Sequence, residues 1–384
     1  MHYRRWERKL AQVLDGLPQF RAALKSGYQR LCYYLYRQPE PLVLHPGAAI
    51  TPVYPREGNS REETFFGYFD QSPWDATDRY HLLHGYAGGS QVRIAVFDTL
   101  DLKLWYLGAS AAFNFQQGAR LGWLPGGEGL VFYNDLAQGR LVTRIVQAAG
   151  GRLEQVVDWP VQVVHPQGNE ALTLNYRRLH RLGSEYGYAG EAENFPDTLR
   201  DDRDGIWRLD LRENRAELLI TLAELKSQDP HPSMAGSHHK VNHLLYTPSG
   251  ERFAFMHRWL GPQGKFSRLY TASSRSGGDL CCLLDERLVS HYAWQDEEHL
   301  LAWGRKTPWG DGYLLVRDRT SQVQAVGQGV LDPYGDGHPS FAPDRRRIVT
   351  DTYPDKARMR HLLLYNRETG KLREVGRFFA PLAY

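Results

Sequence analysis

The sequence predicts an all-β protein of the β-propeller class, with about six or seven four-stranded blades and an N-terminal α-helical extension. Two observations predict it. The 384 residues include 10 Trp, 22 Tyr and 15 Phe together with 37 Gly and 21 Pro, which is typical of many short strands joined by tight turns. One phrase of turn, strand and hairpin also returns about every 40 to 50 residues, the period expected of propeller blades.

The repeated phrase begins with a turn of Pro or Gly type and continues through a β-rich run into a hairpin. Clear copies are WLPGGEGLVFYNDLAQGRLVTRIV, LYTPSGERFAFMHRW, AWQDEEHLLAWGR and SFAPDRRRIVTDTYP. A lone four-stranded blade leaves its apolar faces in water, and stacking of neighbouring blades covers them. We count about six copies of the phrase, which leaves a seventh blade open.

Three segments follow from these patterns. Residues 1–44 are expected to form a basic amphipathic helical extension, residues 45–64 a linker and residues 65–384 the propeller. Apolar residues of the extension recur at spacings of three and four with an interruption near Pro18, so two helices are expected. Basic residues occupy the opposite face. Residues 1–37 therefore either contact an anionic membrane surface or a protein partner, or fold back onto the propeller.

Net charge and cysteine content restrict the partners and the compartment. The formal net charge is +3, which gives no general attraction for nucleic acid, so we expect none as a partner. The 3 cysteines suggest no disulfide framework, and no apolar stretch reaches the roughly 18 residues of a spanning helix. We expect a cytoplasmic protein, with membrane association through its N-terminus as an option.

Three successive blades carry a histidine at the same point of the phrase: His243 in VNHLLY, His291 in VSHYAW and His338 in DGHPSF. Loops that enter the innermost strands of a propeller converge on one end of its channel, so equivalent positions meet there. Imidazoles bind divalent metals, and a nearby carboxylate supplies charge. His243, His291 and His338, with Asp336 two residues before His338, are thus a candidate site for a divalent metal such as Mn, Zn or Ca.

The middle of the chain adds polar side chains that suit an acidic sugar. The segment NYRRLHRLGSEYGYAG is expected to be a long insertion between strands. Guanidinium groups clamp carboxylates, and tyrosine rings stack on sugars while their hydroxyls move protons. A solvated basic loop is the alternative. The candidate substrate-binding residues here and at other strand ends are Arg177, Arg178, His180, Arg181, Gln116, Gln117, His239 and Arg305, and the candidate catalytic residues include Tyr188 and Arg258.

The three histidine phrases, VNHLLYTPSGERFAF, VSHYAWQDEEHLLAW and GHPSFAPDRRRIVTD, resemble blades of the oligogalacturonate lyases. These are cytoplasmic seven-bladed propellers that cleave acidic oligosaccharides with a bound manganese ion. The resemblance implies a catalytic role for His243 beside the substrate and metal-ligand roles for His291 and His338. It departs at Asp336, where the family has a histidine. Over the whole chain, phrases such as QQGARLGWLPG are similar to uncharacterised bacterial propeller proteins.

Together these residues predict β-elimination on a uronic-acid-containing oligosaccharide or polysaccharide, assisted by the metal or by Arg258. His243 is the expected base, because an imidazole accepts a proton near neutral pH, and Tyr188 the expected acid. The alternative is a non-catalytic propeller that binds a glycan or protein, as in envelope-polysaccharide assembly at the membrane. Two-carboxylate hydrolysis and serine or cysteine catalysis are less well supported, since no acidic pair stands at equivalent positions and G-x-S-x-G is absent.

Overall fold

The computed structural model describes residues 18–37, 40–51, 62–188 and 200–381. The chain divides into two compact units, each described here by itself. Unit 1 comprises residues 1–50 and 283–384, and unit 2 comprises residues 51–282. The described residues form six antiparallel sheets of the propeller-blade type, with few helices, so the predicted β-propeller class is confirmed.

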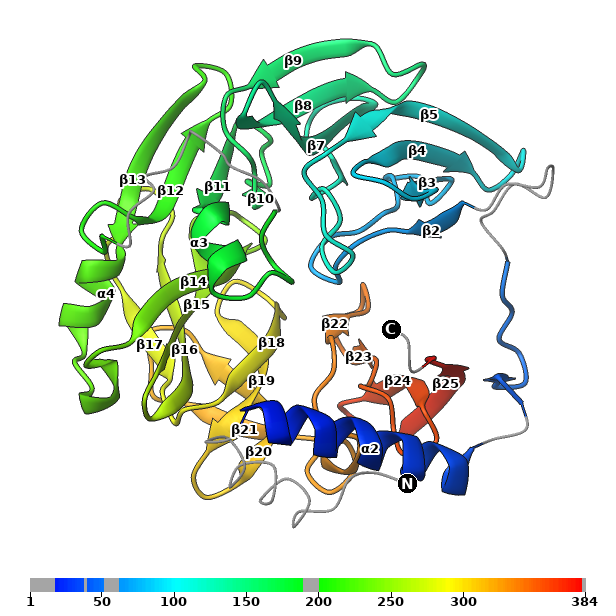
Figure 1. The fold of residues 1–384 in the computed structure, drawn as a ribbon, viewed down its shortest axis with the longest axis vertical. Helices are drawn as coiled ribbons and strands as arrows, with labels where there is room; N and C mark the ends of the chain where they lie inside the picture. Colours follow the sequence, from blue (N-terminus) through cyan, green and yellow to red (C-terminus); the bar gives the residue numbers. More distant parts are fainter. Residues whose placement is uncertain (1–17, 38–39, 52–61, 189–199, 382–384) are drawn as a thin grey trace. The chain divides into compact units, whose positions relative to one another are not determined.

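Unit 2 contains four blade sheets in which the strands are hydrogen-bonded in chain order (Figure 1). The first two are β2 (Glu63–Phe65), β3 (Tyr80–Tyr86), β4 (Val92–Asp98) and β5 (Lys103–Ser110), then β6 (Gly122–Trp123), β7 (Leu130–Ala137), β8 (Arg140–Gln147) and β9 (Leu153–Val157). The next two are β10 (Val163–Val164), β11 (Glu170–Leu174), β12 (Gly205–Asp210) and β13 (Arg215–Thr221), then β14 (His238–Tyr246), β15 (Arg252–Gly261), β16 (Gly264–Ser273) and β17 (Cys281–Leu284).

Unit 1 contains two blade sheets. One has the order β18 (Val289–Trp294), β19 (His299–Lys306), β20 (Gly310–Arg317) and β21 (Val323–Val326). The other contains β22 (Ser340–Phe341), β23 (Arg347–Thr350), β24 (Met359–Asn366) and β25 (Leu372–Phe379), and β1 (Leu42–Leu44) pairs with β25 as a fifth strand. Residues at the end of the expected helical extension therefore form a strand.

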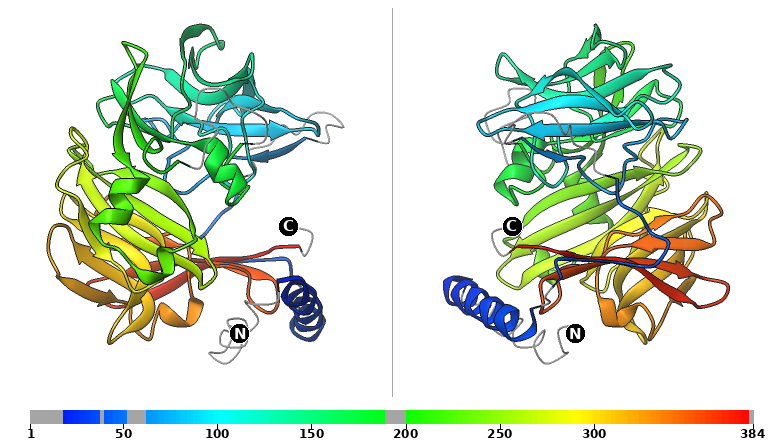
Figure 2. Two further views of the ribbon diagram at one scale, coloured as in Figure 1. Left: turned by 60° about the vertical axis from the view of Figure 1, so that its left-hand side comes forward. Right: turned by 90° about the vertical axis from the view of Figure 1, so that its right-hand side faces the viewer.

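Short helices interrupt the strands, and one longer helix precedes them. That helix, α2 (Pro18–Tyr36), begins at a proline, which favours the first helical position because it needs no amide donor there. In Figure 2 it lies beside the sheet of β1 and β25, where Tyr33 packs against Phe379 at 5.7 Å between ring centroids. The other helices are α3 (Tyr176–Arg181), α4 (Leu222–Gln228), η2 (Pro232–Met234) and η3 (Asp332–Tyr334). Any helix in residues 1–17 lies outside the described residues.

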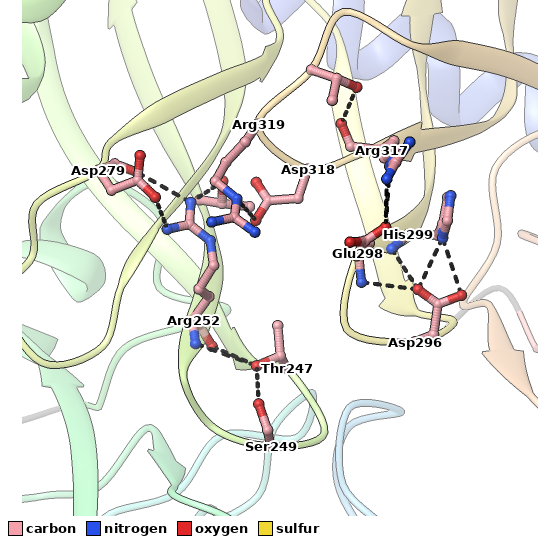
Figure 3. Close-up of polar contacts among 12 residues, drawn as sticks. Thr247, Ser249, Arg252, Asp279, Asp296, Glu298, His299, Arg317, Asp318 and Arg319 are labelled. Carbon is pink, nitrogen blue, oxygen red and sulfur yellow. Dashed lines mark hydrogen bonds and ion pairs between the residues drawn. The ribbon is translucent and has the colours of Figure 1, made fainter.

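The turns that open the repeated phrases have the predicted tight geometry (Figure 3). In unit 2, the amide of Thr247 donates to the Arg252 carbonyl, and the Arg252 guanidinium continues to Asp279 at 2.7 Å. In unit 1, one carboxylate oxygen of Asp296 accepts the amide and the Nδ1 of His299, both within 2.9 Å. The bond from the His299 amide to the Asp296 side chain replaces a ladder bond where the chain reverses.

The apolar faces of the blades form the cores of the two units. In unit 2, the largest cluster of buried residues runs from Tyr68 through the strands of the third and fourth sheets to Ala272. In unit 1, Leu301, Trp303 and Tyr313 pack with residues of the last sheet, including Ile348. Blade faces that would be wet in isolation are thus buried against neighbouring sheets of the same unit.

Candidate functional site

His243 occupies an unusual place in β14 of unit 2. Its φ is 56°, and the pairing of β14 with β15 shifts register between Asn242 and Leu245. A non-glycine residue rarely adopts positive φ, and such strain collects at functional sites. The buried ring lies parallel to Tyr68, with 5.3 Å between centroids and 11° between planes. Tyr186 meets the same imidazole edge-on at 4.9 Å and 84°.

The segment after α3 brings Tyr186 to this histidine. The chain turns back tightly there, and a Cβ on Gly187 would lie 2.3 Å from the His180 amide nitrogen, so only glycine fits. The Gln116 amide donates to the Tyr186 hydroxyl at 3.3 Å, and the Asn114 amide donates to the Gly187 carbonyl at 3.2 Å. The loop of residues 114–118 therefore holds Tyr186 in place.

Two buried cations lie next to this aromatic group. Lys240 of β14 stands directly opposite Arg258 of β15. The Lys240 ammonium donates to the Leu182 carbonyl at 2.8 Å and lies 5.8 Å from the centre of the Tyr186 ring. Burial lowers the pKa of Lys240 to about 8, Glu185 opposes that shift and Arg258 adds to it. Like charges placed opposite each other repel, so this face favours an anionic ligand.

Asn242 adds a second sign of a ligand site on the same face of β14. It follows Lys240 by two residues, and alternate residues of a strand share a face. Its side chain is 1 % exposed, and within the described residues neither its oxygen nor its nitrogen has a hydrogen-bond partner. Buried amides are normally satisfied, which makes this one a candidate contact for a polar ligand.

Tyr188, the expected acid, lies in a different environment. Its ring stacks on Tyr176 at 4.4 Å and 6°, and its hydroxyl accepts a bond from the Asn134 amide at 2.9 Å. Burial raises the pKa of Tyr188 to about 12. These contacts suit a structural residue. Tyr186, two residues earlier, is the tyrosine that lies against His243.

Arg178 and His239, both expected to contact substrate, form contacts with other residues of unit 2. The Arg178 guanidinium is buried and bonds to Asp204 at 2.6 Å, and it also donates to the His239 carbonyl. The His239 Nδ1 lies 2.9 Å from the Nε2 of His257, and burial lowers the pKa of His239 to about 4. These contacts fasten α3 to β14 within unit 2.

The remaining residues that were expected to bind substrate differ in burial and in their contacts. Gln116 bonds to Tyr186 as described, whereas Gln117 is buried. In α3, Arg181 is exposed, and Arg177 and His180 are half-buried. In unit 1, Arg305 forms an ion pair with Asp311 at 2.6 Å, and this pairing explains the position of the Arg305 side chain.

The structure brings together the two histidines of unit 1. The rings of His291 and His338 lie 4.1 Å apart. The Nδ1 of His291 is 3.1 Å from Asp336, and the Nδ1 of His338 is 2.8 Å from Asp351. However, no group of three or more His, Cys, Asp or Glu in the described residues is arranged to hold a metal ion. The residues do not fit the expected metal, and no chemical step is assigned to one.

Sequence reasoning missed Lys240, Asn242 and Tyr68. Lys240 and Asn242 precede His243 in the phrase SHHKVNH. The alternation of β14 was a usable signal for placing Lys240 and Asn242 on one face. Tyr68 comes from a distant loop before the first full strand of unit 2, and its position beside His243 depends on tertiary packing alone. No sequence pattern points to that contact.

The chain was compared with protein-family models, curated proteins and solved structures. No protein-family model and no curated protein matches it. Among solved structures, it is similar to an oligogalacturonate lyase in complex with manganese, at 13% identity and a TM-score of 0.41, covering 90% of this chain and 95% of that one. It is also similar to TolB from Acinetobacter baumannii, at 13% identity and a TM-score of 0.40, covering 74% of this chain. This chain spans 59% of the length of that protein.

A third similar structure is a periplasmic gluconolactonase from Pseudomonas aeruginosa, at 12% identity and a TM-score of 0.44, covering 79% of this chain and 84% of that one. All three are β-propellers, and the likeness extends to the fold only.

Proposed function

We propose that unit 2 carries a lyase-like centre that cleaves a uronic-acid-containing glycan by β-elimination, with His243 as its base. One observation carries the proposal: His243 is held at positive φ between Tyr68 and Tyr186, and Tyr186 lies beside the buried cation Lys240. A base, a hydroxyl and a positive charge are the three groups that this reaction requires.

In the proposed step, the imidazole of His243 removes the proton from C5 of the uronate. The electrons of that C–H bond form a C4–C5 double bond, and the bond from C4 to the glycosidic oxygen breaks. The Tyr186 hydroxyl gives its proton to that oxygen, and exchange with solvent resets both groups. Lys240 and Arg258 neutralise the carboxylate and stabilise the negative charge that develops on it, which makes the C5 proton more acidic. The step consumes no co-reactant.

The direct test compares the protein with its His243→Ala variant on polygalacturonate and alginate. We expect unsaturated products, detected by their ultraviolet absorbance, from the unaltered protein, and a rate lowered at least about a hundredfold in the variant, because general-base catalysis contributes that much. His238→Ala is the matched control, since His238 is an exposed histidine of the same strand. Equal rates in both variants would remove His243 from the mechanism.

A second proposal concerns helix α2 in unit 1 and follows from its exposed side chains. Leu31, Tyr34 and Leu35 are 56%, 68% and 67% exposed, and their spacing places them on one face of the helix. The helix contains no acidic residue, and Arg30 and Arg37 are exposed beside this face. We propose that this face rests on an anionic membrane surface. Exposed leucine and tyrosine side chains flanked by arginine favour binding to such a surface.

This proposal agrees with the non-catalytic alternative of a membrane-associated propeller and with a cytoplasmic setting. None of the described helices is long and apolar enough to cross a membrane. Co-sedimentation with phosphatidylserine vesicles tests the contact. The double variant Leu31→Ser, Leu35→Ser should lose binding, whereas Ile50→Ser, an equally exposed apolar site of unit 1, should not. Unchanged binding of the double variant would exclude the contact.

A further inference from the structure

Phe115 in unit 2 presents an aromatic ring to solvent. Its side chain is 62% exposed, which is unusual for a phenylalanine. Three half-buried rings support it from behind: Tyr86 at 5.0 Å, Phe65 at 5.5 Å and Phe113 at 5.7 Å between centroids. Tyr86 and Phe113 meet it at 87° and 88°, the edge-to-face arrangement that aromatic pairs prefer. The supporting rings thus fix the orientation of Phe115.

The backbone around Phe115 is also fixed. The amide and carbonyl of Asn114 both bond to Gly118, and the Asn114 side chain accepts the amides of Gln116 at 3.1 Å and Gln117 at 2.7 Å. Gly118 has a φ of 60°, and a Cβ there would lie 2.3 Å from the buried ring of His84. This five-residue loop therefore presents Phe115 at little further loss of conformational entropy on binding.

The loop connects Phe115 to the proposed catalytic centre. Gln116 is the next residue, and its amide donates to the Tyr186 hydroxyl, which belongs to the ring that meets His243. Phe115 and Gln116 leave the loop in different directions, one into solvent and one toward Tyr186. Phe115 is therefore the neighbour in sequence of a residue that contacts the proposed centre.

We propose that Phe115 is a stacking platform for a pyranose ring of the glycan beyond the bond that is cleaved. The proposal rests on the function proposed above. The apolar C–H face of a pyranose matches one aromatic ring in size, whereas a protein partner requires a much wider apolar patch. The supporting rings Tyr86, Phe65 and Phe113 are half-buried, so the exposed surface is that of one ring.

Affinity electrophoresis in native gels that contain polygalacturonate or alginate tests the platform. Measurements are made in the unaltered protein and in the His243→Ala background, which keeps the glycan intact. We expect Phe115→Ala to raise Kd about fivefold, as the loss of one aromatic stack predicts. Phe115→Leu should raise Kd by the same factor, and Phe115→Trp should leave Kd unchanged. Leu100→Ala is the matched control, because Leu100 is an equally exposed apolar side chain of unit 2 at 72% exposure.

Each outcome of this experiment supports or overturns the platform or the lyase proposal. Retardation of Phe115→Ala equal to that of the unaltered protein, full rescue by Phe115→Leu, or no retardation of any form on either glycan would overturn the platform. A Phe115-dependent retardation without release of unsaturated product would keep the platform and overturn the lyase proposal. If product release is lost in His243→Ala while the affinity does not depend on Phe115, the lyase proposal would be kept and the platform would be overturned.

Discussion

At the scale of single residues, Arg120 shows how unit 2 tolerates a fully buried charge. The guanidinium of Arg120 is 0% exposed, and two of its nitrogens bond to the two oxygens of Asp70 at 3.0 Å. A buried pair of this bidentate kind stabilises the fold little over an apolar pair, but either partner alone is strongly destabilising. Arg120 and Asp70 therefore stabilise the fold only as a pair.

We predict that Arg120→Met lowers the free energy of unfolding by about 3 to 5 kcal/mol, because it leaves the Asp70 carboxylate buried without its partner. The double variant Arg120→Met, Asp70→Asn should recover much of the loss. Arg200→Ala, which removes an ion pair with Asp202 that is about half exposed on both sides, should leave the stability nearly unchanged. Denaturant titration measures all three, and a small effect of Arg120→Met would contradict the assignment.

Lys240 gives a prediction for pH. Its pKa is lowered to about 8, chiefly by burial, so it loses its charge as the pH rises through about 8 instead of near its usual value of 10.5. We expect the affinity for polygalacturonate to fall about tenfold through that range, the equivalent of one lost charge contact of ~1.4 kcal/mol. Lys240→Arg should bind with no such pH dependence. An unaltered protein whose Kd stays constant across this range would exclude Lys240 from the anion contact.

At the scale of elements, the hairpins could be predicted from their turn residues, whereas the pairing of strands that are distant in sequence could not. Both turns in Figure 3 follow phrases with proline, glycine or aspartate at fixed places, and the structure has them there. Strand β1 is only Leu42–Leu44, and its partner β25 lies at the other end of the chain. Three residues carry no periodicity, so the sequence alone predicts only a continuation of the helical extension there.

The same limit applies to the candidate site. Alternation predicts the faces of β14 up to Asn242 and the resemblance pointed to His243, but the register shift between Asn242 and Leu245 is not visible in the sequence. The choice between Tyr186 and Tyr188 depends on how the segment after α3 folds back through Gly187, which sequence alone does not reveal.

The pairing of β1 with β25 can be tested by proline substitution. The His45 amide donates to Val375 and the Phe379 amide donates to Pro41, so alternation places the Val43 amide in the same ladder. We predict that Val43→Pro lowers the unfolding free energy by about 3 kcal/mol or more, whereas Leu42→Pro, whose amide points away from β25, costs less. Thermal unfolding of both variants measures the difference, and equal Tm values would contradict this pairing.

At the scale of the whole molecule, the repeat period and composition were enough to predict a propeller, and six blade sheets are present in the described residues. Burial in these sheets also makes several histidines poor proton acceptors. Burial lowers the pKa of His84 and of His239 to about 4, and burial also holds the pKa of His257 well below its usual value. Their environments come from packing between distant strands, which a sequence pattern does not report.

These histidines predict acid sensitivity. Unfolded imidazoles titrate near 6.5, so between about 6.5 and 4 the unfolded chain binds more protons than the folded one, and stability falls as the pH is lowered through that window. The gap for His84 alone corresponds to about 3 kcal/mol. Denaturant titration across this range should show the loss, and His84→Gln should reduce its slope. A flat profile in the unaltered protein would contradict the burial of these groups.

The central claim, that His243 starts an elimination, is tested most directly by the mass of the products released from polygalacturonate. Elimination yields a new end that is lighter by one water molecule than the end left by hydrolysis. We predict that the unaltered protein and His238→Ala release these lighter fragments and that His243→Ala releases none. Hydrolytic masses, or lighter fragments at an undiminished rate from His243→Ala, would contradict the account.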